Sequence, residues 1–381
     1  MINILFIHQS ADLYGSDKTL LQLLTYLDRT KFNPVVVIPL NGPLKDELEK
    51  VNVEVYITPV LKLYRNIVTP KNGLKFFSEY KKAIRFLDEI NEKHKFDIIY
   101  SNTLAVLLGM IYAKKRKIKH IWHVHEIIVH PKIIANFFPK LLNKYADSIV
   151  CNSIATLTNL TQRIPQIKDK SIVIYNGVEP INEINASVCK TDFGFKTNDI
   201  IITLVGRIYR LKGHKLLLSS FIKQFSDQEN VKLLFVGSPV IGQEKYLYEV
   251  EEIIKTNLIT DKVKILPFTK NLNSIWQITD IAVMPSTEAE SFGLVAVEAM
   301  MAKKPVIGSN HGGLTEIIIN NKTGLLFEPN NEKKLTEAIQ YLIENPIKRL
   351  EIGENGQNSV SEKFSITSYI QNFENLFLTL K

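Results

Sequence analysis

Cysteine is nearly absent from this chain of 381 residues: only Cys151 and Cys189 occur, and their positions fit neither a disulfide framework nor a metal-ligand spacing. No apolar run approaches the roughly 20 residues that a membrane-spanning helix needs. The opening stretch MINILFIHQS has no basic leader and no small-residue cleavage site, so we expect a buried strand there rather than a signal peptide. These absences exclude a disulfide-rich secreted scaffold and predict a cytoplasmic protein.

Three ligand-binding motifs are missing as well. The chain has no GxGxxG fingerprint, which argues against an NAD-dependent oxidoreductase, and no Gly-Lys-Ser/Thr of a Walker loop. It also lacks an Asp-x-Asp pair that would chelate a divalent metal. We therefore expect no metal and no cofactor. A bound diphosphate would have to be stabilised by cationic side chains and helix N-termini.

Positive charge is concentrated in the first half of the chain. The net charge is +8, and residues 1–180 carry 25 Lys and Arg against 16 Asp and Glu, which is +9. The remainder carries 22 against 23, which is −1. One interpretation is a lysine-rich solvated surface. The other is attraction to an anionic partner such as a phosphate-bearing lipid, a membrane surface or nucleic acid.

Short β-rich runs alternate with helical patterns in both halves, which predicts an α/β protein with two Rossmann-like, doubly wound domains. The strands expected in the first half are INILFIH, NPVVVIPL, VEVYIT, FDIIYSN, HIWHVHE and SIVCNS, and those in the second are DIIITLVG, VKLLFVG, VKILPF, IAVMPS, KPVIGS and GLLFE. Helices are expected over 214–226, 244–256, 332–344 and 366–381, and a hinge over 176–198. A ligand is expected in the cleft between the domains, at the carboxyl ends of strands.

The loop LVGRIYRLKGH, residues 204–214, follows the first strand of the second domain. Gly206 permits a tight exit, and Arg207 and Lys212 bring two cations into one loop before a helix that starts near Gly213. A guanidinium fork and an ammonium point charge suit a diphosphate. The alternative is two surface cations beside a turn.

Two glycine-containing turns are weaker candidates. In SNHGGLTEII, Gly312 and Gly313 open a helix, where backbone N–H groups can meet an anion, although such a pair is often only a turn. In HQSADLYGSDKTLLQLL, Gly15 allows a ligand to approach the backbone, and Ser16 or Asp17 is explained as a helix cap.

Glu290 and Glu298 flank the start of an apolar helix in STEAESFGLVAVEAM. With a helix start near Phe292, the N–H groups of residues 291–294 point into the cleft and Glu298 lies one turn deeper on the same face. Two carboxylates would accept hydrogen bonds from ribose and sugar hydroxyl groups. Alternatively, Glu290 interacts favourably with the helix dipole and Glu298 is a surface residue.

The segment PSTEAESFGLVAVEAMMAKKPVIGSNHGGLTEIIINNKTGLLFEP, with VGRIYRLKG, YNGVE and GSDKTLL, resembles the signature of the retaining glycosyltransferases of family 4, which have the GT-B fold. The resemblance covers nearly the whole chain. It implies an acceptor-binding domain over 1–180, a nucleotide-sugar-binding domain over 181–363, and a last helix, 364–381, that packs back on the first domain. Lys303 departs from the family, which often has Gly there, and we expect only an altered turn.

The resemblance also implies residue roles. Arg207 and Lys212 would neutralise the diphosphate, Glu290 would contact the donor sugar, and Glu298 would hold the ribose. The implied donor-binding set is Glu298, Ser291, Phe292, Gly293, Leu294, Gly206, Phe268, Gly312 and Gly313, and the implied acceptor-side set is Gly15, Ser16 and Asn102.

Three histidines crowd one strand end in HIWHVHEII, residues 120–128. Alternation places His123 and His125 on one face, with Glu126 opposite. A metal site would lack a third ligand, and a core or surface histidine is the plain alternative. The resemblance favours His125 as the catalytic residue that reaches the transferred sugar, with His123 as the competing choice.

The expected reaction is metal-independent transfer with retention, from a nucleoside diphosphate-sugar to a glycan or lipid-linked acceptor in cell-surface polysaccharide synthesis. No carboxylate is convincing as a nucleophile for double displacement, so a front-face reaction is the hypothesis. The alternatives are a nucleotide-sugar 2-epimerase of the same fold and a non-catalytic sugar-nucleotide binding protein.

Lysines alternate with aromatic and apolar residues over 71–87 and 130–145, and a cationic run covers 114–119. Solvated lysines on core-facing helices explain these segments. Peripheral docking to an anionic membrane, on the inner face, explains them too. Nucleic acid is not expected as a partner, because no recognition fold or stacking platform is evident.

Overall fold

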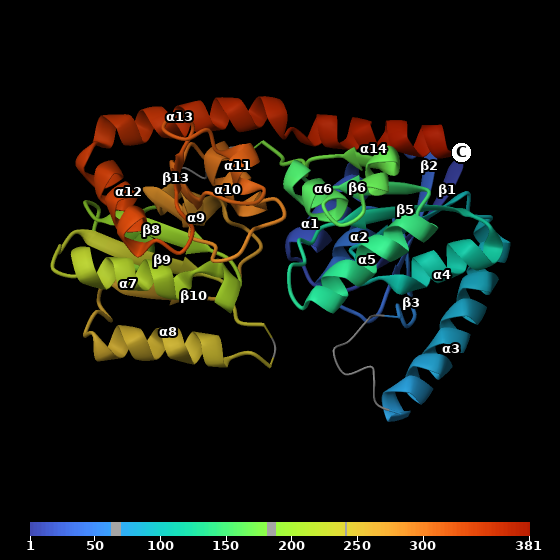
Figure 1. The fold of residues 1–381 in the computed structure, drawn as a ribbon. Helices are drawn as coiled ribbons and strands as arrows, with labels where there is room; N and C mark the ends of the chain where they lie inside the picture. Colours follow the sequence, from blue (N-terminus) through green and yellow to red (C-terminus); the bar gives the residue numbers. More distant parts are fainter. Residues whose placement is uncertain (62–69, 181–187, 241) are drawn as a thin grey trace. The chain divides into compact units, whose positions relative to one another are not determined.

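The computed structural model describes residues 1–61, 70–180, 188–240 and 242–381 (Figure 1). It divides into two compact units, Met1–Gly177 with Ile366–Lys381, and Val178–Ser365. These limits lie two to three residues from the domain limits expected from the sequence, at 180/181 and 363/364. Part of the hinge expected over 176–198, residues 181–187, lies outside the described residues.

The first unit contains a sheet of seven parallel strands in the order β3-β2-β1-β4-β5-β6-β7. The strands are β1 (Ile2–His8), β2 (Phe32–Ile38), β3 (Glu54–Ile57), β4 (Ile98–Asn102), β5 (Lys119–Val124), β6 (Ser148–Cys151) and β7 (Ser171–Val173). The six strands expected in this half are confirmed. The short edge strand β7 was not expected.

Both faces of this sheet are apolar, because parallel strands are covered by helices on each side. Alternation along β1 sends Ile4 and Phe6 to one face and Leu5 and Ile7 to the other. The first face is covered by α1 (Gly15–Tyr26), α2 (Pro43–Lys50) and α14 (Ile366–Leu380). The second face is covered by α3 (Pro70–His94), α4 (Leu107–Arg116), α5 (Lys132–Tyr145) and α6 (Ile154–Thr161).

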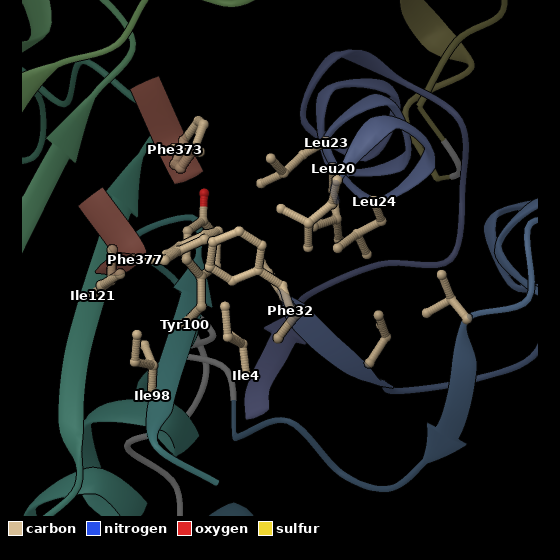
Figure 2. Packing of buried hydrophobic residues seen from close by; sticks show 14 of the residues in the cluster. Ile4, Leu20, Leu23, Leu24, Phe32, Ile98, Tyr100, Ile121, Phe373 and Phe377 are labelled. Carbon is tan, nitrogen blue, oxygen red and sulfur yellow. The ribbon is translucent and has the colours of Figure 1, made fainter. Parts of the chain in front are cut away.

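The last helix, α14, is part of the core of the first unit (Figure 2). Its Phe373 and Phe377 are fully buried and lie 6.0 and 6.2 Å, between ring centroids, from the ring of Tyr100 on β4. Phe32 on β2 meets Phe377 edge-on at 5.7 Å. These aromatic contacts explain the apolar periodicity of this segment, since each buried ring removes a large apolar area from water.

The second unit contains six parallel strands in the order β10-β9-β8-β11-β12-β13. Its strands are β8 (Ile200–Val205), β9 (Val231–Val236), β10 (Val263–Leu266), β11 (Ile281–Met284), β12 (Val306–Ser309) and β13 (Leu325–Phe327). Its helices are α7 (His214–Gln224), α8 (Lys245–Thr256), α9 (Asn273–Ile278), α10 (Leu294–Met301), α11 (Leu314–Ile317), α12 (Glu332–Glu344) and α13 (Pro346–Lys363). All six strands and the three helices expected here are confirmed.

The turn after α10 accounts for the unusual Lys303. This residue has a φ of 58°, in the left-handed region, directly after the helix cap Ala302. Helices commonly end on a glycine in this conformation, because glycine has no Cβ to clash there. A lysine at this position therefore keeps the turn at a modest conformational cost.

In each sheet the strand order reverses at one point, between β1 and β4 in the first and between β8 and β11 in the second. Ligands of doubly wound sheets bind at the carboxyl ends of the strands at such a point. In the first sheet, His8 is in register with Asn102, and Asn102 with His123. The loops after β8 and β11 carry Arg207, Lys212 and Glu290.

None of the helices in the described part of the chain has the length and apolar character required to cross a membrane.

Candidate active site

The loop after β8 is held in place by close backbone contacts. The Gly206 N–H donates to the Val236 carbonyl at 2.9 Å. A Cβ on Gly237 would lie 2.0 Å from the Gly206 carbonyl oxygen, so the two strand ends meet only because position 237 is glycine. The aliphatic part of Lys212 packs against Gly206. A Cβ placed at position 206 would lie 3.5 Å from Cδ of Lys212. The loop therefore fixes the stem of Lys212, while Arg207 is exposed.

Lys212 and Glu290 form an ion pair with 2.8 Å between Nζ and Oε1. Their side chains are 33% and 19% exposed, so water screens the pair only in part. Burial works to raise the pKa of the Glu290 carboxyl, but the charge and hydrogen bond of Lys212, with the Ser286 hydroxyl, hold that pKa below its ordinary value. Glu290 is therefore an ionised acceptor at neutral pH.

Two residues that support Glu290 were missed by sequence reasoning. The Ser286 hydroxyl donates to the same Oε1 of Glu290, and His311 Nε2 lies 2.9 Å from the Ser286 carbonyl oxygen. Burial lowers the pKa of His311, against the raising effect of its bond to Ser286 and of the Glu290 charge. The position of Ser286, just after a strand and four residues before Glu290, is the one available sequence signal.

The start of α10 differs from the expectation. The helix begins at Leu294, after Gly293 with a φ of 116°, and not near Phe292. Phe292 is 2% exposed, and its ring lies 5.4 Å from that of Phe364, so its side chain belongs to the core of the unit. Ser291 precedes the helix as well. Glu298 lies in the second turn of α10 and is half-buried.

The Gly312–Gly313 turn has a structural reason that differs from the expected one. The Gly313 N–H donates to the Glu290 carbonyl oxygen at 2.8 Å, so the expectation that it is available to an anion is wrong. A Cβ on Gly313 would lie 2.4 Å from the Phe292 carbonyl oxygen, and one on Gly312 would lie 2.3 Å from that of Glu290. The two glycines are required where two backbone segments cross.

A small pocket opens where β8 and β11 end beside α10. Its polar lining comes from Lys212, Ser286 and Glu290. The remaining lining residues are Leu204, Val205, Met284, Pro285, Gly293, Val295, Ala296 and Leu314. Phe268, after β10, is 38% exposed, and its N–H donates to the Ser238 hydroxyl at 3.0 Å.

The first unit contains a polar cluster at the carboxyl ends of β1, β4 and β5. His125 Nε2 lies 2.8 Å from Asn102 Oδ1, and Asn102 Nδ2 lies 2.9 Å from His8 Nδ1. His8 Nε2 lies 2.6 Å from Oδ1 of Asp17 on α1. Burial lowers the pKa of His125 to about 3, so this imidazole is neutral at neutral pH.

His123 and His125 share a face as expected, with ring centroids 3.8 Å apart. His123 is 1% exposed, and its Nδ1 lies 2.5 Å from the Tyr100 hydroxyl, which makes it part of the core. Glu126 accepts hydrogen bonds from the N–H groups of Leu104 and His125, both at 3.1 Å, and burial raises its pKa to about 7. Among the described residues, no three His, Cys, Asp or Glu side chains are arranged to hold a metal ion.

The expected cap at the start of α1 is present. Asp17 Oδ2 accepts a hydrogen bond from the Tyr14 N–H at 2.9 Å, which satisfies a backbone donor at the helix start. The Ser16 carbonyl accepts from Asn102 Nδ2 at 3.2 Å. A Cβ on Gly15 would meet no atom within 4 Å, so this glycine leaves open space beside the backbone.

Comparison with known proteins matches both units to glycosyltransferases. The family model described as glycosyl transferases group 1 matches residues 189–359, and that of glycosyltransferase family 4 matches residues 14–181. An uncharacterised glycosyltransferase of Methanocaldococcus jannaschii is 30% identical over 84% of this chain and 83% of its own length. The capsular polysaccharide biosynthesis glycosyltransferase CapM of Staphylococcus aureus is 27% identical over 90% and 94%.

Comparison of the fold with solved structures agrees with this result. The crystal structure of Anabaena HepE in complex with UDP-glucose superimposes with a TM-score of 0.87 at 24% identity, covering 100% of both chains. Two successive Rossmann-like domains, each built on a parallel sheet, define the GT-B class of glycosyltransferases. With the relative from Methanocaldococcus jannaschii, this shows that the chain belongs to the group 1 glycosyltransferases, of the family 4 type, and is a glycosyl-transferring enzyme (EC 2.4).

Proposed function

We propose that this enzyme transfers a sugar, with retention and without a metal ion, from a nucleoside diphosphate-sugar to a glycan or lipid-linked acceptor in cell-surface polysaccharide synthesis. The observation that carries the proposal is the Lys212–Glu290 ion pair, 2.8 Å across, at the strand-order reversal of the second sheet. UDP or UDP-glucose is bound by HepE, and the name of CapM refers to capsular polysaccharide. Both facts support the choice of donor and pathway type.

The donor is held by side chains from three loops. Arg207 and Lys212 bind the diphosphate, since one offers a planar fork and the other a point charge. Glu290, kept ionised by Lys212, accepts hydrogen bonds from hydroxyl groups of the transferred sugar, and Glu298 accepts from the ribose. The backbone at Gly206, Ser291–Leu294 and Gly312, with Phe268 near the base, completes the donor contacts.

Transfer proceeds on one face of the sugar. The bond from the anomeric carbon to the diphosphate oxygen breaks, and the diphosphate leaves with the electron pair. The acceptor hydroxyl attacks the same face and gives its proton to the leaving phosphate oxygen. Arg207 and Lys212 stabilise the developing negative charge. Each such cationic group raises kcat by roughly 100-fold or more. His125 of the first unit contacts the transferred sugar, and Gly15, Ser16 and Asn102 border the acceptor.

Incubation of the purified protein with a series of nucleoside diphosphate-sugars tests the proposal. The matching donor is expected to raise the unfolding temperature, because a ligand at 100 times its Kd adds about 2.7 kcal/mol. Free nucleoside diphosphate should then accumulate over time only when a glycan or lipid-linked acceptor is added. EDTA should leave the rate unchanged. Epimerisation of the donor without acceptor would support a 2-epimerase, and binding without any turnover would support a non-catalytic binding protein.

Helix α5 supports membrane docking as part of this proposal. Ile133 is 82% exposed and Phe137 39%, and they lie one turn apart, so they share a face of the helix. Lys140 and Lys144, both exposed, follow on the same face at the spacing of three and four residues. Exposed apolar side chains bordered by lysines are typical of helices that bind the surface of anionic bilayers.

Vesicles rich in phosphatidylglycerol are expected to bind the protein at low salt and to release it as salt rises, because the lysine contribution is screened. Ile133→Glu with Phe137→Glu should weaken binding by at least about tenfold, since each buried apolar side chain contributes roughly 1.5–3 kcal/mol. Ile347→Glu is a matched control, because Ile347 is 83% exposed on the second unit. Equal binding of all variants in a flotation assay would exclude the α5 surface.

A further inference from the structure

Four side chains of the first unit form a continuous hydrogen-bonded series, Asp17–His8–Asn102–His125, with successive distances of 2.6, 2.9 and 2.8 Å. They come from α1, β1, β4 and the residue after β5, so the series crosses the strand-order reversal. Asp17, His8 and Asn102 are each at most 1% exposed. A buried carboxylate is costly unless it is paired, and His8 is the partner that offsets the burial of Asp17.

The backbone fixes the direction of every hydrogen bond in the series. The Asn102 amide nitrogen is assigned by the Ser16 carbonyl, 3.2 Å away, because a carbonyl only accepts. Asn102 Nδ2 therefore donates to Nδ1 of His8 as well, and Nδ1 of His8 carries a lone pair. The proton of His8 is then on Nε2, directed at Oδ1 of Asp17.

The same assignment determines His125. Asn102 Oδ1 can only accept, so the Nε2 of His125 carries the proton. The second neighbour of this Nε2, Nδ1 of His123 at 3.1 Å, also faces the Tyr100 hydroxyl and is compatible as an acceptor. A neutral imidazole has one protonated nitrogen, so Nδ1 of His125 is a hydrogen-bond acceptor.

We propose that Asp17, His8 and Asn102 are positioning residues that hold His125 as the Nε2–H tautomer, so that its Nδ1 accepts a hydrogen bond from a hydroxyl group of the transferred sugar. This inference rests on the proposed role of His125 in transfer. The series orients the ring through the protonated nitrogen and leaves the other nitrogen for the substrate, as the partner of a functional histidine commonly does. Burial keeps His125 neutral, which this arrangement requires.

Asp17→Asn is expected to reverse the donor and the acceptor in each hydrogen bond of the series. The Tyr14 N–H, 2.9 Å from Oδ2, requires an acceptor, so the new amide oxygen takes that position and the amide nitrogen faces His8. His8 Nε2 then becomes an acceptor and its Nδ1 a donor. The Asn102 amide then turns to accept from His8 and to donate to His125 Nε2, at the cost of its single bond to the Ser16 carbonyl. The proton of His125 moves to Nδ1, and the acceptor for the sugar is lost.

Nitrogen NMR of the full-length protein with ¹⁵N-labelled histidine tests the assignment without any activity measurement. His125 is identified by the signal missing from His125→Gln. In the wild-type protein, Nε2 of His125 is expected to be protonated and Nδ1 not, and in Asp17→Asn the two are expected to exchange. A protonated Nδ1 in the wild type, or an unchanged tautomer in Asp17→Asn, would overturn the proposal.

Kinetics separate this proposal from the proposed function. Asp17→Asn should lower kcat by about tenfold or more, the effect of a lost hydrogen bond to substrate, with little change in the KM for donor. Ser10→Ala is the matched control, because the Ser10 hydroxyl donates to the same Asp17 oxygen and lies 3.3 Å from His8 Nε2, while its removal leaves the four side chains of the series in place. It should retain the tautomer and kcat. If Asp17→Asn reverses the His125 tautomer but leaves kcat unchanged, the hydrogen-bonded series controls the tautomer as proposed. The proposed contact between His125 and the transferred sugar would then be wrong.

Discussion

Replacing Lys212 by alanine is expected to lower kcat/KM for the nucleotide-sugar by at least about 100-fold, because a cation that stabilises the leaving diphosphate is lost. A second effect acts in the same direction. Glu290, only 19% exposed, loses the charge that offsets its burial, so the pKa of its carboxyl rises. Glu290 then accepts hydrogen bonds from the sugar less well. Both losses fall on the transition state, so kcat decreases more than KM increases.

Steady-state kinetics with the donor identified by thermal shift provides the measurement. Lys215→Ala is the matched control, since Lys215 lies three residues further on and forms an exposed ion pair with Glu249 at 2.7 Å. That pair contributes little, so this variant should have wild-type kinetics. A Lys212→Ala enzyme within threefold of wild-type kcat/KM would exclude the diphosphate role.

A double variant separates the charge of Lys212 from its support of Glu290. Lys212→Ala leaves a half-buried carboxylate unpaired and should reduce stability, by roughly 1–3 kcal/mol after allowance for exposure. Adding Glu290→Gln removes the unpaired charge, so stability should recover. Activity should not recover, because neither the diphosphate cation nor the ionised acceptor is restored. Recovery of activity in the double variant would mean that Lys212 acts only by pairing with Glu290.

The strands were predictable because buried parallel strands appear in a sequence as short runs of β-branched and aromatic residues. INILFIH and VKLLFVG are such runs, and β1 and β9 occupy them. β7 escaped prediction because it has only three residues, SIV, at the edge of its sheet, where partial exposure weakens the apolar pattern. The apolar period of 366–381 predicted α14 but not the rings that it contacts.

The partners of the site residues could not be predicted. Lys212 and Glu290 are 78 positions apart, and their pairing depends on β8 lying beside β11. Asn102 and His8, 94 apart, meet through strand register. The start of α10 was misplaced by two residues, because burial of Phe292 and the left-handed Gly293 outweigh the apolar pattern that continues through them. Single-sequence patterns identify candidate residues, and tertiary contacts decide how they pair.

Gly313→Ala is expected to destabilise the second unit by about 3 kcal/mol or more and to lower transferase activity, because overpacking at a rigid backbone contact cannot be relieved by a side-chain rotation. The added Cβ would lie 2.4 Å from the carbonyl oxygen of Phe292 and 2.5 Å from its Cα. The φ of Gly313 is −62°, which alanine adopts freely, so the expected loss comes from the steric contact alone.

The clash acts directly on the site. To admit a methyl group, the segment that carries Phe292 must move away, and the Gly313 N–H bond to the Glu290 carbonyl, 2.8 Å, lies in the same contact. The Glu290 carboxylate would then shift from Lys212. Thr315→Ala is the control in this turn, since it removes one exposed hydrogen bond to the Gly312 carbonyl and should cost about 1 kcal/mol or less. Equal unfolding temperatures and kcat values for the two variants would contradict the steric role of Gly313.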